Sequence, residues 1–229
     1  MLTLAMLLPM VAVPVKAAPT PVSNFAELKA AIADENVSEI TLTSNIILTE
    51  TLVISDKTIT INGTGTISAD SQVSVADPAA NPNVKNTLFA IKNSTVTFDG
   101  LTLDGNNQNR VIYSEGSELT FSNATITKGC PGDNSTINPG GGIFLRDGSL
   151  TATNTDFIGN TPGTNSDPTL QAGDRDLNGG AIYTGKESAN ITITGGKFED
   201  NEVKAYGHGA AIYQENGSLT VTGTSFKNN

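Results

Sequence analysis

The sequence predicts an all-β fold in which short strands coil into a parallel β-helix, preceded by one short helix. Three observations predict it: brief segments of alternating polarity, apolar triplets that repeat along the chain, and a composition that favours strands and turns. Hydrophobic residues make up 37% of the 229 residues and charged residues only 16%, with 23 glycines and no tryptophan. Such a mixture suits strands and tight turns better than helices.

The chain opens with an apolar segment that has the length of a signal-peptide core and is too short to span a bilayer. We expect residues 1–17 to be a signal peptide with an atypical or truncated n-region, because no Lys or Arg precedes Lys16. Residues 18–22, with prolines at Pro19 and Pro21, are expected to be an extended spacer. The β-helix should occupy residues 23–229 and, since the sequence stops at the end of a repeat, we expect it to be C-terminally truncated.

One helix is expected from Phe25 to about Asp34. Phe25, Leu28 and Ile32 recur at helical spacing and should face one side. Asn24 with Glu27 three residues later has the pattern of a capping box. Because this helix would lie directly ahead of the first strand, we expect it to cover the end of the solenoid, where the first apolar layer would otherwise meet water.

Apolar and polar residues alternate from Ile40 onward in segments that follow one another more closely than the strands of a β-sandwich. This spacing fits three strands per coil of a β-helix. Five apolar triplets then recur with almost constant internal spacing, which predicts that each triplet marks the three strands of one coil. The triplets are Phe89, Val96 and Leu103; Ile112, Leu119 and Ile126; Ile143, Leu150 and Phe157; Ile182, Ile191 and Phe198; and Ile212, Leu219 and Phe226.

The distance between triplets varies, which indicates that one corner of the coil accepts insertions. We expect them at residues 129–139, 161–178 and 202–208, all rich in the Gly, Pro, Asn and Asp that surface loops favour. Several third strands end in a turn that contains Asn. Asparagine tolerates left-handed backbone and bonds neighbouring backbone groups, so these residues should stack and join successive coils.

Two sets of residues resemble known families. Gly179-Gly180-Ala181-Ile182, followed by Phe198-Glu199-Asp200-Asn201, resembles the GGA[ILV] and FxxN repeats of polymorphic outer-membrane proteins. The stretch from Phe25 to Gly63 looks like the start of the pectate-lyase-like adhesive domains of bacterial surface proteins. The resemblance covers about residues 22–229. It implies a right-handed single-stranded parallel β-helix at the outer membrane or cell wall of a bacterial or archaeal cell, with adhesion as the usual role.

Composition excludes several classes of partner and cofactor. A formal net charge of −10 disfavours nucleic acid and anionic membranes. One cysteine, Cys130, and one histidine, His208, leave no disulfide framework and no Cys/His metal cluster. We therefore expect no cofactor. Calcium bound at Asp104, Asp133 or the Asp174-Arg175-Asp176 segment is an alternative that no loop motif supports.

We also expect no catalytic residues. Asn154-Thr155-Asp156 and Gly207-His208-Gly209 resemble two motifs of polygalacturonases, whose carboxylates and histidine surround the scissile bond. The register places Asp156 before a third strand and His208 before a first strand, so they should lie at different corners. We favour an exported, non-catalytic adhesin-like or passenger module that binds a host or cell-surface macromolecule or glycan. A lyase or hydrolase of acidic polysaccharides is the alternative.

Outward threonines form the most regular surface feature, because a pair of them flanks an inward residue of the second strand in each coil. Stacked at about 4.8 Å per coil, they would form a flat ladder of hydroxyl and methyl groups. The ladder is similar to the Thr-x-Thr faces of ice-binding solenoids, although Thr is also a common residue of exposed strands. An ice- or glycan-binding face is therefore a further hypothesis. The candidate residues are Thr95, Thr97, Thr120, Ser122, Thr151, Thr153, Thr192, Thr194, Thr220 and Thr222.

Overall fold

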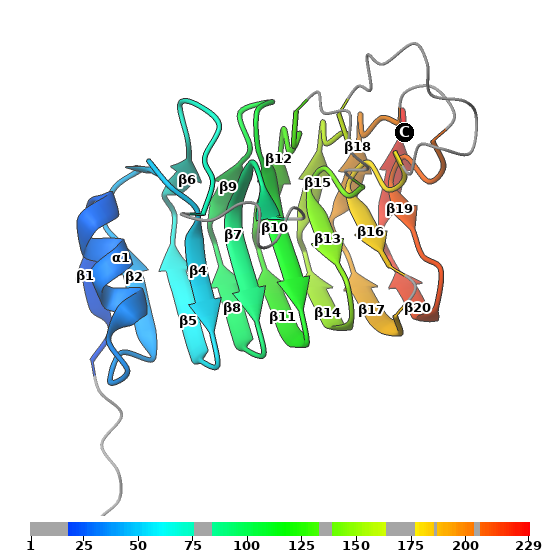
Figure 1. The fold of residues 1–229 in the computed structure, drawn as a ribbon. Helices are drawn as coiled ribbons and strands as arrows, with labels where there is room; N and C mark the ends of the chain where they lie inside the picture. The colour runs from blue at the N-terminus through cyan, green and yellow to red at the C-terminus, as the bar shows by residue number, and fades with distance from the viewer. Residues whose placement is uncertain (1–17, 76–83, 133–138, 164–176, 186, 204–206) are drawn as a thin grey trace, which may run out of the picture.

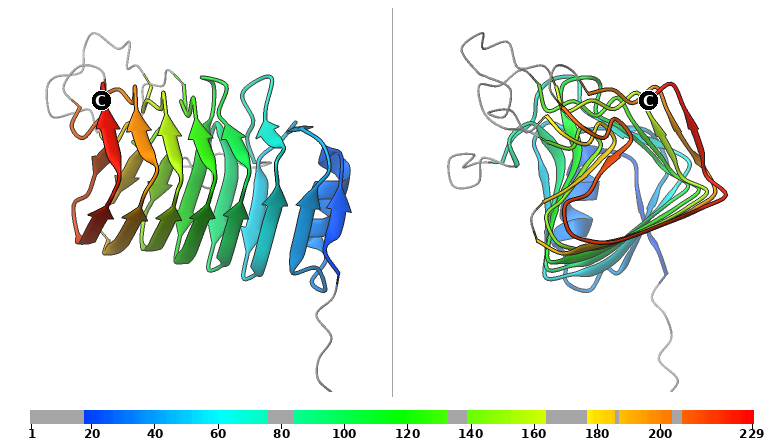
Figure 2. Two further views of the ribbon diagram at one scale, coloured as in Figure 1. Left: turned by 180° about the vertical axis from the view of Figure 1, so that it is seen from behind. Right: turned by 90° about the vertical axis from the view of Figure 1, so that its right-hand side faces the viewer.

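The computed structural model describes residues 18–75, 84–132, 139–163, 177–185, 187–203 and 207–229, so the expected signal peptide lies outside the described residues. Its strands form three parallel sheets that wind around one axis with a triangular cross-section (Figures 1 and 2). Seen with the C-terminal end toward the viewer, the chain turns anticlockwise as it approaches (Figure 2, right). The fold is therefore a right-handed parallel β-helix, as predicted.

Each full coil contributes one strand to each sheet in the order C, A, B. Sheet A contains β1 (Thr20–Val22), β2 (Glu39–Leu42), β5 (Thr58–Gly63), β8 (Thr95–Asp99), β11 (Ser117–Ser122), β14 (Gly148–Thr153), β17 (Ala189–Thr194) and β20 (Gly217–Thr222). Sheet B contains β3 (Ile46–Ile47), β6 (Thr66–Ser68), β9 (Thr102–Asp104), β12 (Thr125–Thr127), β15 (Asp156–Ile158), β18 (Lys197–Glu199) and β21 (Ser225–Lys227). Sheet C contains β4 (Leu52–Ser55), β7 (Thr87–Lys92), β10 (Arg110–Glu115), β13 (Ile143–Leu145), β16 (Ile182–Thr184) and β19 (Ile212–Tyr213).

The predicted triplets stack in register along all three sheets. In sheet C, Ile143 pairs with Ile182, and Ile182 pairs with Ile212. Sheets A and B carry their own triplet members in the same way. In sheet B the rings of Phe157 and Phe198 are stacked with centroids 4.6 Å apart. A continuous apolar core therefore runs along the axis, and the prediction of three strands per coil is confirmed.

The helix α1 (Phe25–Ala33) covers the N-terminal end of this core (Figure 1). Leu28 and Ile32 are buried in the same apolar cluster as the strands. The side chain of Asn24 accepts the Glu27 N–H at 3.0 Å, as predicted, but the Glu27 carboxylate accepts the N–H of Ser23, at 2.7 Å, instead of that of Asn24. At the other end of the helix, Lys57 Nζ donates to the carbonyl oxygen of Ile32 at 2.6 Å.

The prediction that residues 18–22 form a spacer is wrong for the last three of these residues. Thr20–Val22 form β1, the edge strand of sheet A, in which Thr20 pairs with Ile40. Pro21 is tolerated there because an edge strand does not need every backbone N–H for pairing.

The expected insertions leave from one corner, where sheet B passes to sheet C. They connect β12 to β13, β15 to β16 and β18 to β19, and residues 69–86 form a fourth insertion between β6 and β7 that the triplets did not reveal. The other two corners are turns of one to four residues. Among the described residues, no helix has the length and apolar character needed to cross a membrane.

Candidate ligand-binding face

The outer surface of sheet A presents three parallel rows of polar side chains. Strand alternation turns Leu119 and Phe121 of β11 into the core and leaves Glu118, Thr120 and Ser122 on the outside. From β5 to β20 the central row is made only of threonines, each paired with the next along the sheet. It consists of Thr60, Thr97, Thr120, Thr151, Thr192 and Thr220.

The candidate pairs do not all stack as expected. Thr95 pairs with Glu118, and Ser122 pairs with Asp99, so the pair in β8 is displaced by two residues from the pairs in the four following coils. The displacement arises because Thr95 and Thr97 flank the first inward residue of their strand, whereas the other pairs flank the second. The remaining candidates lie in continuous rows: Thr120, Thr151, Thr192 and Thr220 in the centre, and Ser122, Thr153, Thr194 and Thr222 beside them.

The structure adds residues that the sequence analysis left out of this face. Thr60 extends the central row toward the N-terminus. A third row, on the other side of the central one, contains Ser149, Asn190 and Ser218. Within it, Ser218 Oγ donates to Asn190 Oδ1 at 2.8 Å. Strand alternation could have identified the third row. It places one more outward residue two positions before each threonine pair in β14, β17 and β20.

Charge divides the face into two regions. Toward the N-terminus, β8 and β11 carry the exposed carboxylates of Asp99 and Glu118. Toward the C-terminus, β14, β17 and β20 carry no charged residue at all. We call the outward residues of these three strands the neutral patch. It consists of Ser149, Thr151, Thr153, Asn190, Thr192, Thr194, Ser218, Thr220 and Thr222.

Short turns border the neutral patch within the described residues. Sheet A passes to sheet B through two residues in each of these coils, with left-handed backbone at Asn154, where φ is 48°, and at Gly195, where φ is 70°. The insertions leave from the corner between sheets B and C, which lies opposite sheet A in the triangular section (Figure 2). All members of the patch except Ser149 are exposed, and Ser149 is half-buried.

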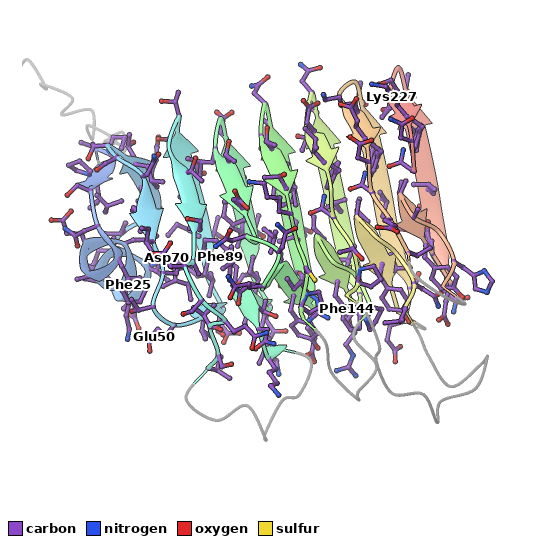
Figure 3. The ribbon with its side chains drawn as sticks, turned by 90° about the horizontal axis from the view of Figure 1, so that it is seen from above. Phe25, Glu50, Asp70, Phe89, Phe144 and Lys227 are labelled. Carbon is purple, nitrogen blue, oxygen red and sulfur yellow. The ribbon has the colours of Figure 1, made fainter. Side chains whose placement is uncertain are left out.

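The outer face of sheet C differs because aromatic side chains stack on it and are mostly buried. Tyr113, Phe144, Tyr183 and Tyr213 form a ladder with centroid separations of 5.3, 5.0 and 5.6 Å (Phe144 is labelled in Figure 3). The buried Arg110 guanidinium lies 5.4 Å from the Phe144 ring. It donates to the carbonyl oxygens of Gly140 and Pro139 at 2.9 and 2.8 Å, and burial lowers its pKa to about 10. This arrangement anchors an insertion.

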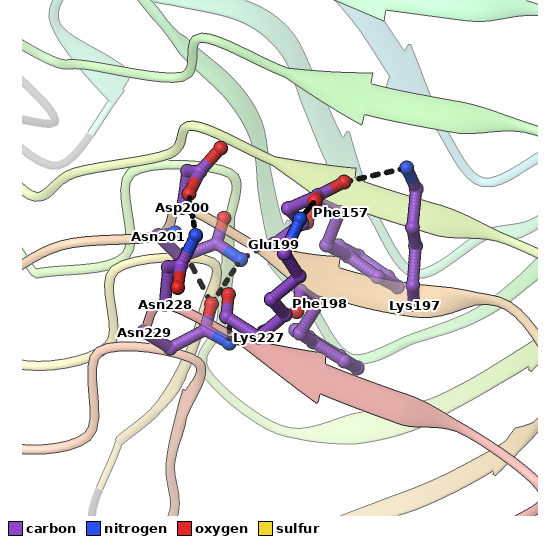
Figure 4. Close-up of polar contacts among 9 residues, drawn as sticks. All are labelled: Phe157, Lys197, Phe198, Glu199, Asp200, Asn201, Lys227, Asn228 and Asn229. Atoms are coloured by element: carbon purple, nitrogen blue, oxygen red, sulfur yellow. Dashed lines mark hydrogen bonds and ion pairs between the residues drawn. The ribbon is translucent and has the colours of Figure 1, made fainter.

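The turn after sheet B carries the predicted asparagine ladder (Figure 4). Asn201 Nδ2 donates to the carbonyl oxygen of Phe157 at 2.9 Å and to Oδ1 of Asn229 at 2.8 Å. Left-handed backbone belongs to the residue before each ladder member, and not to Asn160, Asn201 or Asn229 themselves. The three preceding residues are Gly159, Asp200 and Asn228. The ladder is part of the scaffold.

An ion-pair cluster lies next to the ladder on sheet B (Figure 4). Glu199 lies between Lys197 and Lys227, with Nζ to carboxylate distances of 2.6 and 2.7 Å. Hydrogen bonds from Lys197, then from Lys227, and the charges of both lysines lower the pKa of the Glu199 carboxyl to about 2. The three charges satisfy one another across two coils, so this cluster has a structural explanation.

The residues that resemble polygalacturonase motifs lie apart. Asp156 begins β15, next to the corner between sheets A and B, whereas His208 precedes β19 at the corner between sheets B and C. The His208 N–H donates to Oδ1 of Asn178 at 2.8 Å. The register prediction that these two side chains occupy different corners is confirmed.

The calcium alternative finds no cluster in the described part of the chain, where no three or more His, Cys, Asp or Glu residues could hold a metal ion together. Asp104 instead accepts the Asn106 N–H at 2.8 Å and pairs with Lys128 Nζ at 3.1 Å. Asp133 and the Asp174-Arg175-Asp176 segment lie outside the described residues. Cys130, the single cysteine of the sequence, is half-buried.

Comparison with known families gives one result. Residues 20–131 match the family model described as "Putative pectate lyase-like adhesive domain". This part of the chain is similar to that adhesive family. The matched segment runs from β1 to just beyond β12, so the coils that carry the neutral patch follow it. Comparison of the chain with curated proteins and with solved structures gives no match.

Proposed function

We propose that this protein is an exported adhesive module that binds a host or cell-surface macromolecule or glycan through the outer face of sheet A, without catalysing a reaction. The observation that carries the proposal is the unbroken threonine row from Thr60 to Thr220. It forms a long, regular surface with hydrogen-bonding groups at every coil. The adhesive family of residues 20–131 supports the same role.

Export and surface display follow from the same proposal. Residues 1–17 would act as the signal peptide, and the adhesive family suggests a place outside a bacterial or archaeal cell, at the outer membrane or the cell wall. The solenoid suits this role because stacked coils present one long face to a large ligand, whereas small-molecule sites are usually concave pockets.

The proposal is tested by measuring binding and turnover on the same purified chain. We expect retention on immobilised cell-surface glycans or matrix proteins, and no release of unsaturated uronides from polygalacturonate. The double variant Thr151→Lys and Thr192→Lys should lose retention, because two solvated ammonium groups would stand on the face. The matched control, Thr102→Lys and Thr125→Lys, alters two paired outward threonines of sheet B and should bind normally. Measurable uronide release, or equal loss in both double variants, would contradict the proposal.

A further inference from the structure

The neutral patch differs in charge from the rest of the molecule. The whole chain carries a formal net charge of −10, yet nine neighbouring outward residues on β14, β17 and β20 are uncharged. Sheet B carries Lys197 and Glu199 in the same coil as β17, and sheet C carries Tyr183 there. A neutral area of this size on an acidic protein indicates a ligand that is itself neutral.

We propose that the neutral patch binds an uncharged, hydroxyl-rich polysaccharide whose chain lies along the axis of the solenoid. The inference rests on the proposed adhesive function and specifies its ligand. Acidic polysaccharides are disfavoured because the patch offers no cation to pair with a carboxylate or sulfate, and the negative field of the protein repels them. A cationic polymer would find no carboxylate within the patch, because those of Asp99 and Glu118 lie on β8 and β11.

The chemistry of the rows matches sugar hydroxyls. Each Ser or Thr hydroxyl both donates and accepts, and the Asn190 amide supplies donors and an acceptor, as a ligand of mixed donors and acceptors requires. Each Thr side chain also carries a methyl group, which can contact the C–H faces of sugar rings. The third row contains Ser149, Asn190 and Ser218 instead of Thr, which suits a polymer with varied hydroxyl positions better than a uniform lattice of ordered water.

Periodicity explains why the ligand is a polymer. Adjacent parallel strands lie about 4.7–4.9 Å apart, so the same three side-chain positions recur at that interval in every coil. A repeating ligand that lies along the axis can meet equivalent groups in successive coils, and several weak contacts then act together through a high effective concentration. A single sugar would engage one coil and bind weakly.

The experiment measures binding of the full chain to neutral polysaccharides, a β-glucan and a mannan, and to acidic ones, polygalacturonate and alginate, at low and high salt. We expect binding to at least one neutral polymer, with little dependence on salt because no ion pair is involved. The triple variant Thr151→Val, Thr192→Val and Thr220→Val keeps the β-branched shape and removes three hydroxyls of the central row. It should bind at least tenfold more weakly.

Two controls make the result specific. The triple variant Thr66→Val, Thr102→Val and Thr125→Val alters a matching file of outward threonines on sheet B and should bind like the unaltered chain. Thr192→Glu should abolish binding, whereas Thr66→Glu should not. Thermal unfolding of every variant identifies any loss of fold.

Each outcome decides the inference. Loss in the patch variants alone supports it. Binding only to acidic polymers, binding that survives in the patch variants, or adsorption to ice with no polysaccharide bound overturns it. If the chain binds matrix proteins but no neutral polysaccharide, the ligand class is wrong and adhesion stands; if it binds none of the tested surfaces, or cleaves a polysaccharide, the proposed function fails as well.

Discussion

Asn160 donates from its side-chain amide to Oδ1 of Asn201, 2.9 Å away in the next coil, and both side chains are buried. The same Oδ1 atom also accepts the Asn160 backbone N–H at 3.0 Å. These contacts bond neighbouring coils at a turn where no strand pairing is available, so the ladder continues the sheet hydrogen bonds around the corner.

Replacement of Asn201 by Ala should therefore destabilise the fold strongly. It leaves the Asn160 N–H and the Phe157 carbonyl without their side-chain partner in a buried place, which should lower the free energy of unfolding by about 2–4 kcal/mol. Urea unfolding measures the change. The exposed loop variant Asn36→Ala is the control and should stay within about 0.5 kcal/mol of the unaltered chain. A similar small effect at Asn201 would contradict a structural role for the ladder.

Ser114 offers the opposite test, because its hydroxyl is buried in the core and has no hydrogen-bond partner within the described part of the chain. Ser114→Ala should raise the free energy of unfolding by about 1 kcal/mol, since an unsatisfied buried hydroxyl is removed. Thr184, in the same inward file, accepts the Glu215 N–H at 3.3 Å, so Thr184→Val should lower stability by about 1 kcal/mol. Chemical denaturation of both variants is the measurement, and destabilisation by Ser114→Ala would refute the expectation.

The ion pairs of Glu199 predict a pH dependence of stability. Its pKa in the folded protein is lowered from 4.5 to about 2, so the folded state favours the carboxylate. The stabilisation is present above pH 4.5 and is lost as the pH falls toward 2. The melting temperature of Glu199→Gln should therefore lie below that of the unaltered chain at pH 7, and the gap should close near pH 2. High salt should narrow the gap at pH 7. A gap that does not change with pH would exclude this account, and Glu118→Gln, on sheet A, is the control.

Arg110 should be essential for the anchoring of an insertion on sheet C. Arg110→Met keeps much of the side-chain length but removes the donors that reach the Gly140 and Pro139 carbonyl oxygens. We expect a loss of about 2–4 kcal/mol in the free energy of unfolding, measured by urea titration. The exposed Arg146, which pairs with Glu115 at 3.3 Å, provides the control, and Arg146→Met should cost less than about 1 kcal/mol. Equal effects at the two positions would argue against the anchoring role.

Much of the fold could be predicted from the sequence because a β-helix repeats its core at every coil. Ile143, Ile182 and Ile212 each occupy the first inward position of a coil, and a constant core leaves a constant spacing. The asparagine ladder was predictable for the same reason. The strand at Pro21 was not predictable in the same way, since a missing N–H disfavours a central strand but not the edge strand that β1 forms.

The outer surfaces were harder to predict. Sheet C is covered on both sides, so β7 and β10 read as continuous apolar runs instead of alternating ones, and the ladder from Tyr113 to Tyr213 was missed. On sheet A, each strand has two inward residues, and the sequence does not show which of them aligns with a given inward residue of the next coil. The alternation therefore allows Thr95 to pair either with Glu118 or with Thr120, two residues further along. Only the strand register resolves that choice.

The position of the insertions has a consequence for how such a protein can diversify. A connection that grows or shrinks between sheets B and C changes neither the pitch of the coils nor the order of hydroxyls on sheet A. The corner between sheets B and C can therefore acquire new loops during evolution while sheet A keeps its regular rows of hydroxyls. Selection can act on these two surfaces separately within a single domain.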